Sequence, residues 1–208
     1  MRNTACTAQT VAQAYDNCCD QWDAYRGAKP VNRCVEAFAS LLEPGSRVLD
    51  VGCGAGRPIA SYLVDQGFHV TGIDISERMI AKARALGLRN ADFQVADVLE
   101  YRPPAPFDAV IAFDSLWHVD WSSQAALYGH LASFLRDGGY LMFTHGKHNG
   151  TVTGEMFGER FYYSALDTAE VRGLLTRSGF AILDATEDYR EPTTGDRELI
   201  VTARKTSA

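Results

Sequence analysis

Three glycines and two aspartates have the spacing of a nucleoside-binding site. An apolar run containing Asp50 is followed at once by Gly52, Gly54 and Gly56. Only glycine allows a strand to turn into a helix at such a point while ligand atoms approach the backbone. Asp74 closes the next apolar run, twenty residues after Gly54, where a carboxylate can accept hydrogen bonds from both hydroxyls of a ribose. Together the two features predict one nucleoside site.

The spacing of these glycines separates two classes of cofactor. The pattern is G-x-G-x-G, whereas the dinucleotide fingerprint is G-x-G-x-x-G and places a pyrophosphate at a helix N-terminus. Asp50, two residues before the first glycine, would repel a pyrophosphate but attract an ammonium group. S-adenosylmethionine carries an amino group and a sulfonium, so an acidic pocket suits it better than it suits NAD.

Four stretches of the chain resemble the successive cofactor motifs of class I S-adenosylmethionine-dependent methyltransferases of the small-molecule type. They are residues 48–58, 72–76, 95–98 and 107–119. The resemblance spans about residues 45–145 and implies a seven-stranded sheet whose last strand is antiparallel. It also implies that S-adenosylmethionine lies across the carboxyl ends of the first strands, with S-adenosylhomocysteine as the product.

The resemblance also implies which residues bind each part of the cofactor. They are Gly52, Cys53, Gly54 and Gly56 along the methionine and ribose, Asp74 at the ribose hydroxyls, Ile75 and Met79 over the adenine, Asp97 and Val98 at the adenine amino group, and Phe113 at the methionine end. Asp50 joins this set through its charge, and Tyr15 joins it as part of a roof with Trp22 and Tyr25. The alternative for these three aromatic residues is that they only bury the first helix. Ile75, Met79 and Val98 also fit an ordinary core, because apolar residues at such spacing usually pack.

The catalytic residues are less determined by the sequence. Transfer of a methyl group is an in-line displacement, so positioning can supply most of the acceleration, and a base is needed only for an acidic nucleophile. His118 follows the fourth strand near the expected methyl group, and His145 and His148 follow the fifth. An unperturbed imidazole suits a general base. Each histidine also has a plain alternative, as a partner of a loop carbonyl or as a solvated loop residue.

The stretch 146–165 contains four glycines and four aromatic residues without a clear periodicity. It is predicted to be a long loop that covers the substrate, with Glu155, Phe157, Tyr162 and Tyr163 as candidate contacts. The alternative is a loop packed only by its own side chains.

The order of predicted elements indicates an α/β fold. From residue 47, apolar strands alternate with amphipathic helices, which is typical of a doubly wound, mostly parallel sheet with helices on both faces. Two extra helices precede it. We therefore expect one domain over residues 1–208, with a helical cap (1–44), a cofactor-binding core (45–145), a substrate loop (146–166) and a C-terminal helix and hairpin (167–208).

Composition limits the partners. The net charge of −6 and the absence of basic runs argue against nucleic acid as substrate. No 18-residue apolar segment is present, so we expect no membrane partner and a cytoplasmic location. The five cysteines lack zinc-site spacing, so no metal is predicted. The expected partner is a small-molecule substrate, and the expected state is a monomer or homodimer.

The combined prediction is metal-independent methyl transfer from S-adenosylmethionine to an O, N or C nucleophile of a small metabolite. Two alternatives stay open. One is a non-catalytic, regulatory S-adenosylmethionine-binding domain, because no base is unambiguous. The other is an NAD-dependent oxidoreductase, which shares the glycine turn and the acidic residue.

Overall fold

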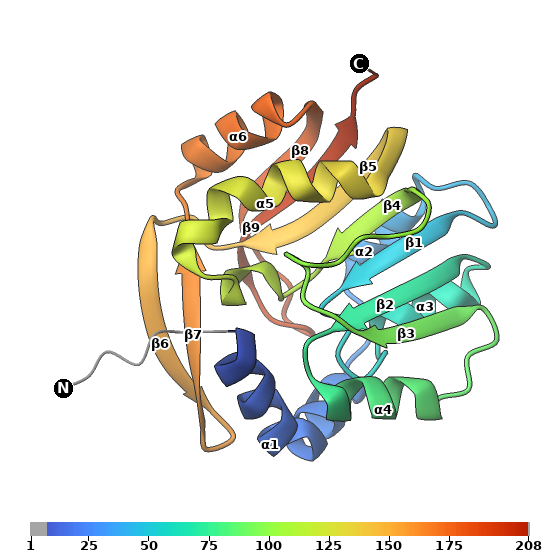
Figure 1. The fold of residues 1–208 in the computed structure, drawn as a ribbon, viewed down its shortest axis with the longest axis vertical. Coiled ribbons are helices and arrows are strands. Elements are labelled where there is room, and N and C mark those ends of the chain that lie inside the picture. The colour runs from blue at the N-terminus through green and yellow to red at the C-terminus, as the bar shows by residue number, and fades with distance from the viewer. Residues whose placement is uncertain (1–7, 208) are drawn as a thin grey trace.

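A seven-stranded sheet forms the centre of the protein, seen in a computed structural model that describes residues 8–207 (Figure 1). The strand order is β3-β2-β1-β4-β5-β9-β8, and only β9 runs antiparallel to its neighbours β5 and β8. The strands are β1 (Arg47–Val51), β2 (His69–Asp74), β3 (Ala91–Val95), β4 (Phe107–Ala112), β5 (Leu135–His145), β8 (Phe180–Tyr189) and β9 (Arg197–Lys205). The predicted doubly wound sheet is confirmed. One of the five cysteines, Cys6, and the first seven residues of the predicted helical cap lie outside the described residues.

Helices cover both faces of this sheet. They are α2 (Arg33–Ala39), α3 (Ile59–Asp65) and α4 (Glu77–Ala85) on one face, and α5 (Trp121–Phe134) and α6 (Thr168–Arg177) on the other. Successive residues of a strand point to opposite faces, so Val48 packs in the core under α2 and α3, while Leu49 packs in the core under α5 and α6. Burial on both faces explains the nearly continuous apolar runs of the strands.

The segment predicted as an irregular loop is instead a β-hairpin. Strands β6 (Gly150–Met156) and β7 (Glu159–Ala165) form a separate two-stranded antiparallel sheet. Phe157 and Gly158 make the turn, both at positive φ (53° and 82°), as a two-residue hairpin turn requires. Two glycines within the strand hid the alternation in the sequence, which is why the prediction of a loop was wrong.

Helix α1 (Ala8–Gly27) lies across the carboxyl edge of the sheet rather than on a face. It contacts α4 on one side and the hairpin strand β7 on the other (Figure 1). The strand order reverses at this edge, between β1 and β4. Ligands of open α/β sheets bind at such a reversal, so the fold directs attention to the space between α1 and the ends of β1, β2 and β4.

Candidate active site

A cavity of about 240 Å³ lies at this edge of the sheet, beneath α1. Most of the residues predicted to form the site line it. They are Tyr15, Asp50, Gly52, Cys53, Gly54, Asp74, Ile75, Met79, Asp97, Val98, Phe113 and His118. Residues from five strands and helices and from the turns between them therefore meet around one space.

The glycine turn forms the floor of the cavity. Gly52 and Gly54 both have positive φ, 74° and 54°. The backbone N–H groups of Gly52 and Cys53 donate to the carbonyl of Ile73, at 2.8 and 3.1 Å. A Cβ atom at Gly52 would collide with Ser115, so this position needs glycine both for its conformation and for its space.

Gly56 has a different role from the other two glycines. It does not line the cavity, and a Cβ atom there would lie 3.0 Å from Leu86 and 3.2 Å from Phe93. The structure therefore corrects its predicted place beside the cofactor, because close packing between the turn and its neighbours accounts for this glycine.

The Asp74 carboxylate fastens the turn to the second strand. Its two oxygens accept hydrogen bonds from the backbone N–H groups of Gly54 and Ser76, each at 2.9 Å. Burial raises the pKa of Asp74, although the backbone hydrogen bonds oppose this shift. Ser76 caps α4 by accepting a hydrogen bond from the N–H of Met79 at 3.1 Å, as serine commonly does at this position.

Asp50 and Arg26 bring opposite charges to the same cavity, and the charge of Arg26 partly offsets the rise in the pKa of Asp50 that burial causes. Asp50 is 2% exposed, and its Oδ2 has no hydrogen-bond partner among the described residues. Burial, followed by the charge of Asp74, raises the pKa of Asp50 to about 7. Arg26 is 8% exposed, and no ion pair or hydrogen bond of its guanidinium occurs within residues 8–207. Such buried, unpartnered charges are costly unless a ligand satisfies them.

Sequence reasoning missed Arg26. The signal was present, because Arg26 follows Trp22 by four residues and Tyr15 by eleven, which places all three on one face of a helix. The signal was a basic residue on the same helix face as the aromatic residues that were predicted to cover the site.

Tyr15 and His118 are joined by a hydrogen bond of 2.8 Å between the tyrosine hydroxyl and Nε2 of the ring. The other ring nitrogen, Nδ1, lies 2.9 Å from the carbonyl oxygen of Tyr162. Because a carbonyl can only accept, Nδ1 carries the proton and Nε2 accepts from Tyr15. Nε2 also accepts from the indole of Trp117 at 3.2 Å. Burial lowers the pKa of His118 to about 4, so the ring is neutral.

His145 and His148 do not reach the cavity, in contrast to their predicted place near the methyl group. His145 is 1% exposed and points into the core, with Nε2 at 3.1 Å from Oε1 of Gln124 and Nδ1 at 2.7 Å from the carbonyl of Gly146. Gln124 in turn donates to the carbonyls of Leu116 and Val119, at the two ends of the 3₁₀ helix η1 (Leu116–His118). His148 lies on the surface.

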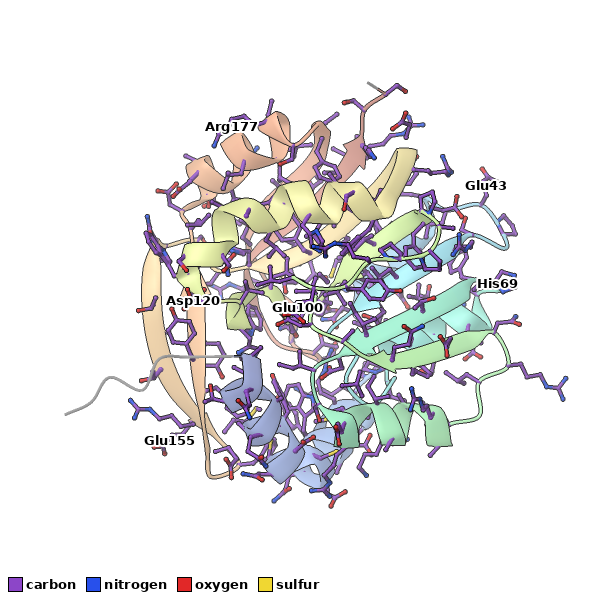
Figure 2. The ribbon with its side chains drawn as sticks, in the orientation of Figure 1. Glu43, His69, Glu100, Asp120, Glu155 and Arg177 are labelled. Atoms are coloured by element: carbon purple, nitrogen blue, oxygen red, sulfur yellow. The ribbon has the colours of Figure 1, made fainter. Side chains whose placement is uncertain are left out.

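The four hairpin residues that were predicted to contact the substrate also lie outside the cavity lining. Glu155 is exposed at the far end of the hairpin, well away from the cavity residue Asp120 (Figure 2). The ring of Phe157 lies edge-on to the exposed ring of Tyr25, with 6.0 Å between the ring centroids. Tyr163 packs behind His118 with 5.0 Å between ring centroids, and Tyr162 contributes its carbonyl. The hairpin therefore supports the cavity wall from behind.

A sequence model of the family described as a methyltransferase domain matches residues 22–183, which is most of the chain. The chain belongs to this methyltransferase family. The prediction from sequence of a class I methyltransferase is thereby confirmed.

Relatives and solved structures agree with this assignment. The chain is 36% identical over 130 residues to a ubiquinone biosynthesis O-methyltransferase of Xylella fastidiosa, in an alignment that covers 58% of this chain and 52% of that protein. The chain thus spans about half the length of the curated relatives it matches first.

Two solved structures share the fold at lower identity. Magnesium protoporphyrin IX methyltransferase from Synechocystis, with S-adenosylmethionine bound, has a TM-score of 0.74 at 24% identity and covers 98% of this chain and 100% of that one. Burkholderia thailandensis 1,6-didemethyltoxoflavin-N1-methyltransferase, with S-adenosylhomocysteine bound, has a TM-score of 0.75 at 23% identity over 96% and 89%. These likenesses show the fold.

Two searches of the described residues bear on partners. Within residues 8–207, no helix is long and apolar enough to cross a membrane. Across the same range, His, Cys, Asp and Glu side chains form no group of three or more suited to a metal ion.

Proposed function

We propose that this chain transfers the methyl group of S-adenosylmethionine to an oxygen or nitrogen nucleophile of a small metabolite, without a metal. The observation that carries the proposal is the unpartnered Oδ2 of Asp50, which lines one cavity with the buried Arg26 beside the glycine turn. The methionine end of the cofactor has an ammonium and a carboxylate, which match these two charges. NAD offers no such pair, and its pyrophosphate would lie close to Asp50.

The rest of the cavity fits the remainder of the same cofactor. Asp74 retains free lone pairs for ribose hydroxyls while it holds the turn. Met79 is buried and lines the same cavity, and Oδ1 of Asp97 accepts a hydrogen bond from the N–H of Leu99 at 2.9 Å. When bound, the cofactor would supply an electrophilic methyl group on a sulfonium. The residues Asp50, Arg26 and Asp74 would hold it.

Tyr15 favours an oxygen or nitrogen nucleophile over carbon. Its proton is donated to His118, so the free lone pairs of its oxygen can only accept a further hydrogen bond. A substrate O–H or N–H can donate to that oxygen, whereas a carbon nucleophile offers only a weak donor. Burial and the charge of Asp74 raise the pKa of Tyr15 well above its usual range, so the phenol stays protonated.

His118 is a positioning residue in this mechanism. Its only lone pair is already shared between Tyr15 and Trp117, so the ring orients the tyrosine rather than contacting substrate. Methyl transfer then depends on in-line positioning and on the exclusion of water by α1. The proton of the nucleophile points to the oxygen of Tyr15, which orients it but does not accept it, and this proton is lost to solvent after the methyl group has moved and S-adenosylhomocysteine has formed.

The test is incubation of the purified protein with methyl-labelled S-adenosylmethionine and a metabolite extract, together with calorimetry against S-adenosylhomocysteine and NAD. We expect labelled products and binding of S-adenosylhomocysteine alone. Arg26→Gln should weaken that binding about tenfold or more, as loss of a buried charged hydrogen bond does. Binding of NAD but not S-adenosylhomocysteine would overturn the proposal.

A further inference from the structure

The lining of the cavity carries an excess of negative charge. Its carboxylates are Asp23, Asp50, Asp74, Asp97, Asp114 and Asp120, and its cationic side chains are Arg26 and Arg57. His118 also lines the cavity but is neutral, because burial lowers its pKa to about 4. This negative net charge of the lining affects which charge a second ligand can carry.

Two of these carboxylates form ion pairs with arginines, and those arginines are then not free to bind another anion. Arg57 donates to Asp23 at 2.8 Å. Asp114 accepts hydrogen bonds from both Nε and Nη2 of Arg197, at 2.6 and 2.5 Å. Arg197 is outside the lining, and the two bonds form a bidentate pair. Bidentate pairs of this kind are strong and geometrically fixed. Neither Arg57 nor Arg197 is therefore available to an incoming anion.

The remaining carboxylates are bound to backbone or hydroxyl groups rather than to cations. Asp74 and Asp97 accept from backbone N–H groups. Asp120 accepts from the N–H and hydroxyl of Ser122, at 3.0 and 2.6 Å. Asp50 has an unpartnered oxygen. Such hydrogen bonds stabilise a carboxylate but do not remove its negative charge. Burial raises the pKa of Asp50 to about 7, and the ammonium of the cofactor favours its ionised form.

Arg26 is the remaining cation, and the proposed function assigns it to the carboxylate of the cofactor. The cofactor adds a sulfonium and an ammonium, which leaves the lining with more carboxylates than cations. A second anion would lie among these carboxylates, away from water and without a cationic partner, and both conditions are unfavourable.

Apolar side chains line part of the cavity that is left for the acceptor. Ala8 and Val11 of α1 line the cavity, as do Leu116 and Val119 from the segment after β4. Val11 and Leu116 are buried at 3% and 1% exposure. Apolar walls with one polar group suit a flat or aliphatic body.

We propose that the methyl acceptor is a neutral or cationic small molecule with an apolar body, and that phosphorylated or carboxylate-bearing acceptors are rejected. This inference rests on the proposed function and narrows its substrate class. It follows from the excess of lining carboxylates, the arginines already held in ion pairs and the apolar side chains of the lining.

The experiment divides a metabolite extract on an anion exchanger at pH 8 and incubates each fraction with the protein and labelled S-adenosylmethionine. We expect label in the unretained, neutral and cationic fraction, at about tenfold or more over the retained fraction, a ratio that about 1.4 kcal/mol of discrimination produces. Label mainly in the retained, anionic fraction would overturn the inference while leaving methyl transfer intact. No label in any fraction, with S-adenosylhomocysteine bound in calorimetry, would overturn the proposed function and this inference with it.

A charge variant tests the cause of the selectivity. Ala8→Lys places a cation at the exposed start of α1, on the cavity lining. We expect it to raise the share of label in the anionic fraction about threefold or more, since one added cation near a bound anion contributes about 0.7 kcal/mol or more at moderate screening. Val152→Lys is the control, because Val152 is 66% exposed on β6, away from the lining. Equal shares in both variants would contradict the electrostatic cause.

Discussion

The floor and the roof of the cavity are built in different ways. The floor consists of the glycine turn and Asp74, and its key contact joins residues only twenty positions apart, from Gly54 to Asp74. The roof depends on the bond between Tyr15 and His118, which are 103 positions apart, and on the carbonyl of Tyr162 in the hairpin. Local backbone geometry therefore defines the floor of the proposed donor site, whereas tertiary packing of α1 and β7 defines the roof.

The largest effect is expected at the floor, from Gly52→Ala. The added Cβ would meet Ser115, and alanine would have to adopt a φ of 74°. These two costs together amount to about 2–4 kcal/mol of unfolding free energy. Denaturant unfolding should show that loss, and calorimetry should show no binding of S-adenosylhomocysteine.

Gly45→Ala is the matched control for Gly52→Ala. Gly45 has a similar φ of 79°, but a Cβ there meets nothing within 4 Å. We expect a loss of about 1–2 kcal/mol from the conformation alone, with cofactor affinity unchanged. Equal effects of the two substitutions would mean that the approach of Ser115 to the turn is unimportant.

The next effect tests the roof. Tyr15→Phe removes the oxygen proposed to accept from the substrate and leaves the ring packing in place, so kcat/KM should fall about tenfold or more while affinity for S-adenosylhomocysteine stays within about twofold. His118→Gln should reduce activity less, because it misplaces the tyrosine without deleting it.

Tyr25→Phe is the control for Tyr15→Phe, since Tyr25 is 48% exposed on the same helix and lies outside the cavity lining. Tyr25→Phe should leave kcat/KM unchanged. A loss of cofactor affinity in Tyr15→Phe, with normal turnover at saturation, would instead assign Tyr15 to the cofactor, as the sequence first predicted.

A smaller, pH-dependent effect is expected from Asp50. Burial raises its pKa to about 7 in the ligand-free protein, and an ammonium group favours the ionised form. Affinity for S-adenosylhomocysteine should therefore rise with pH through about 7, by at most about tenfold per unit, and level off above it. Calorimetry in two buffers should detect proton release near pH 6.5. Asp50→Asn should bind more weakly and without this pH dependence.

The raised pKa of Asp50 also predicts that the free energy of unfolding falls with rising pH, whereas the affinity for S-adenosylhomocysteine rises. The folded protein binds a proton at Asp50 that the unfolded chain has already lost between about pH 4 and pH 7. The contribution of Asp50 to the free energy of unfolding therefore falls as pH rises through this range and is constant above it. Comparison of unfolding curves for the ligand-free protein and Asp50→Asn isolates this term, and a constant difference between pH 5 and 8 would contradict it.

The floor could be predicted from the sequence because its determinants are local. Strand periodicity, the glycine spacing and Asp74 all lie within one βαβ unit, where short-range rules apply. The roof could not be predicted in the same way. Arg26 and the carbonyl of Tyr162 reach the site only through packing between distant elements, and Gly150 and Gly154 concealed the hairpin. His145 was misplaced because its side chain turns inward to Gln124 at the end of β5.

The smallest effect concerns the exposed ion pairs that hold the roof to the core. Asp20 on α1 pairs with Arg78 at 3.0 Å and with Lys82 at 2.9 Å, and its side chain is 68% exposed. Exposed pairs contribute little and are screened by salt. Asp20→Asn should lower Tm by about 1–2 °C at low salt and by nothing measurable at 1 M salt. Glu100→Gln is the control, because Glu100 is on the surface and has no ion pair within the described residues. A loss that persists at 1 M salt would show that α1 depends on Asp20 for more than charge, and would contradict a roof that is held chiefly by packing.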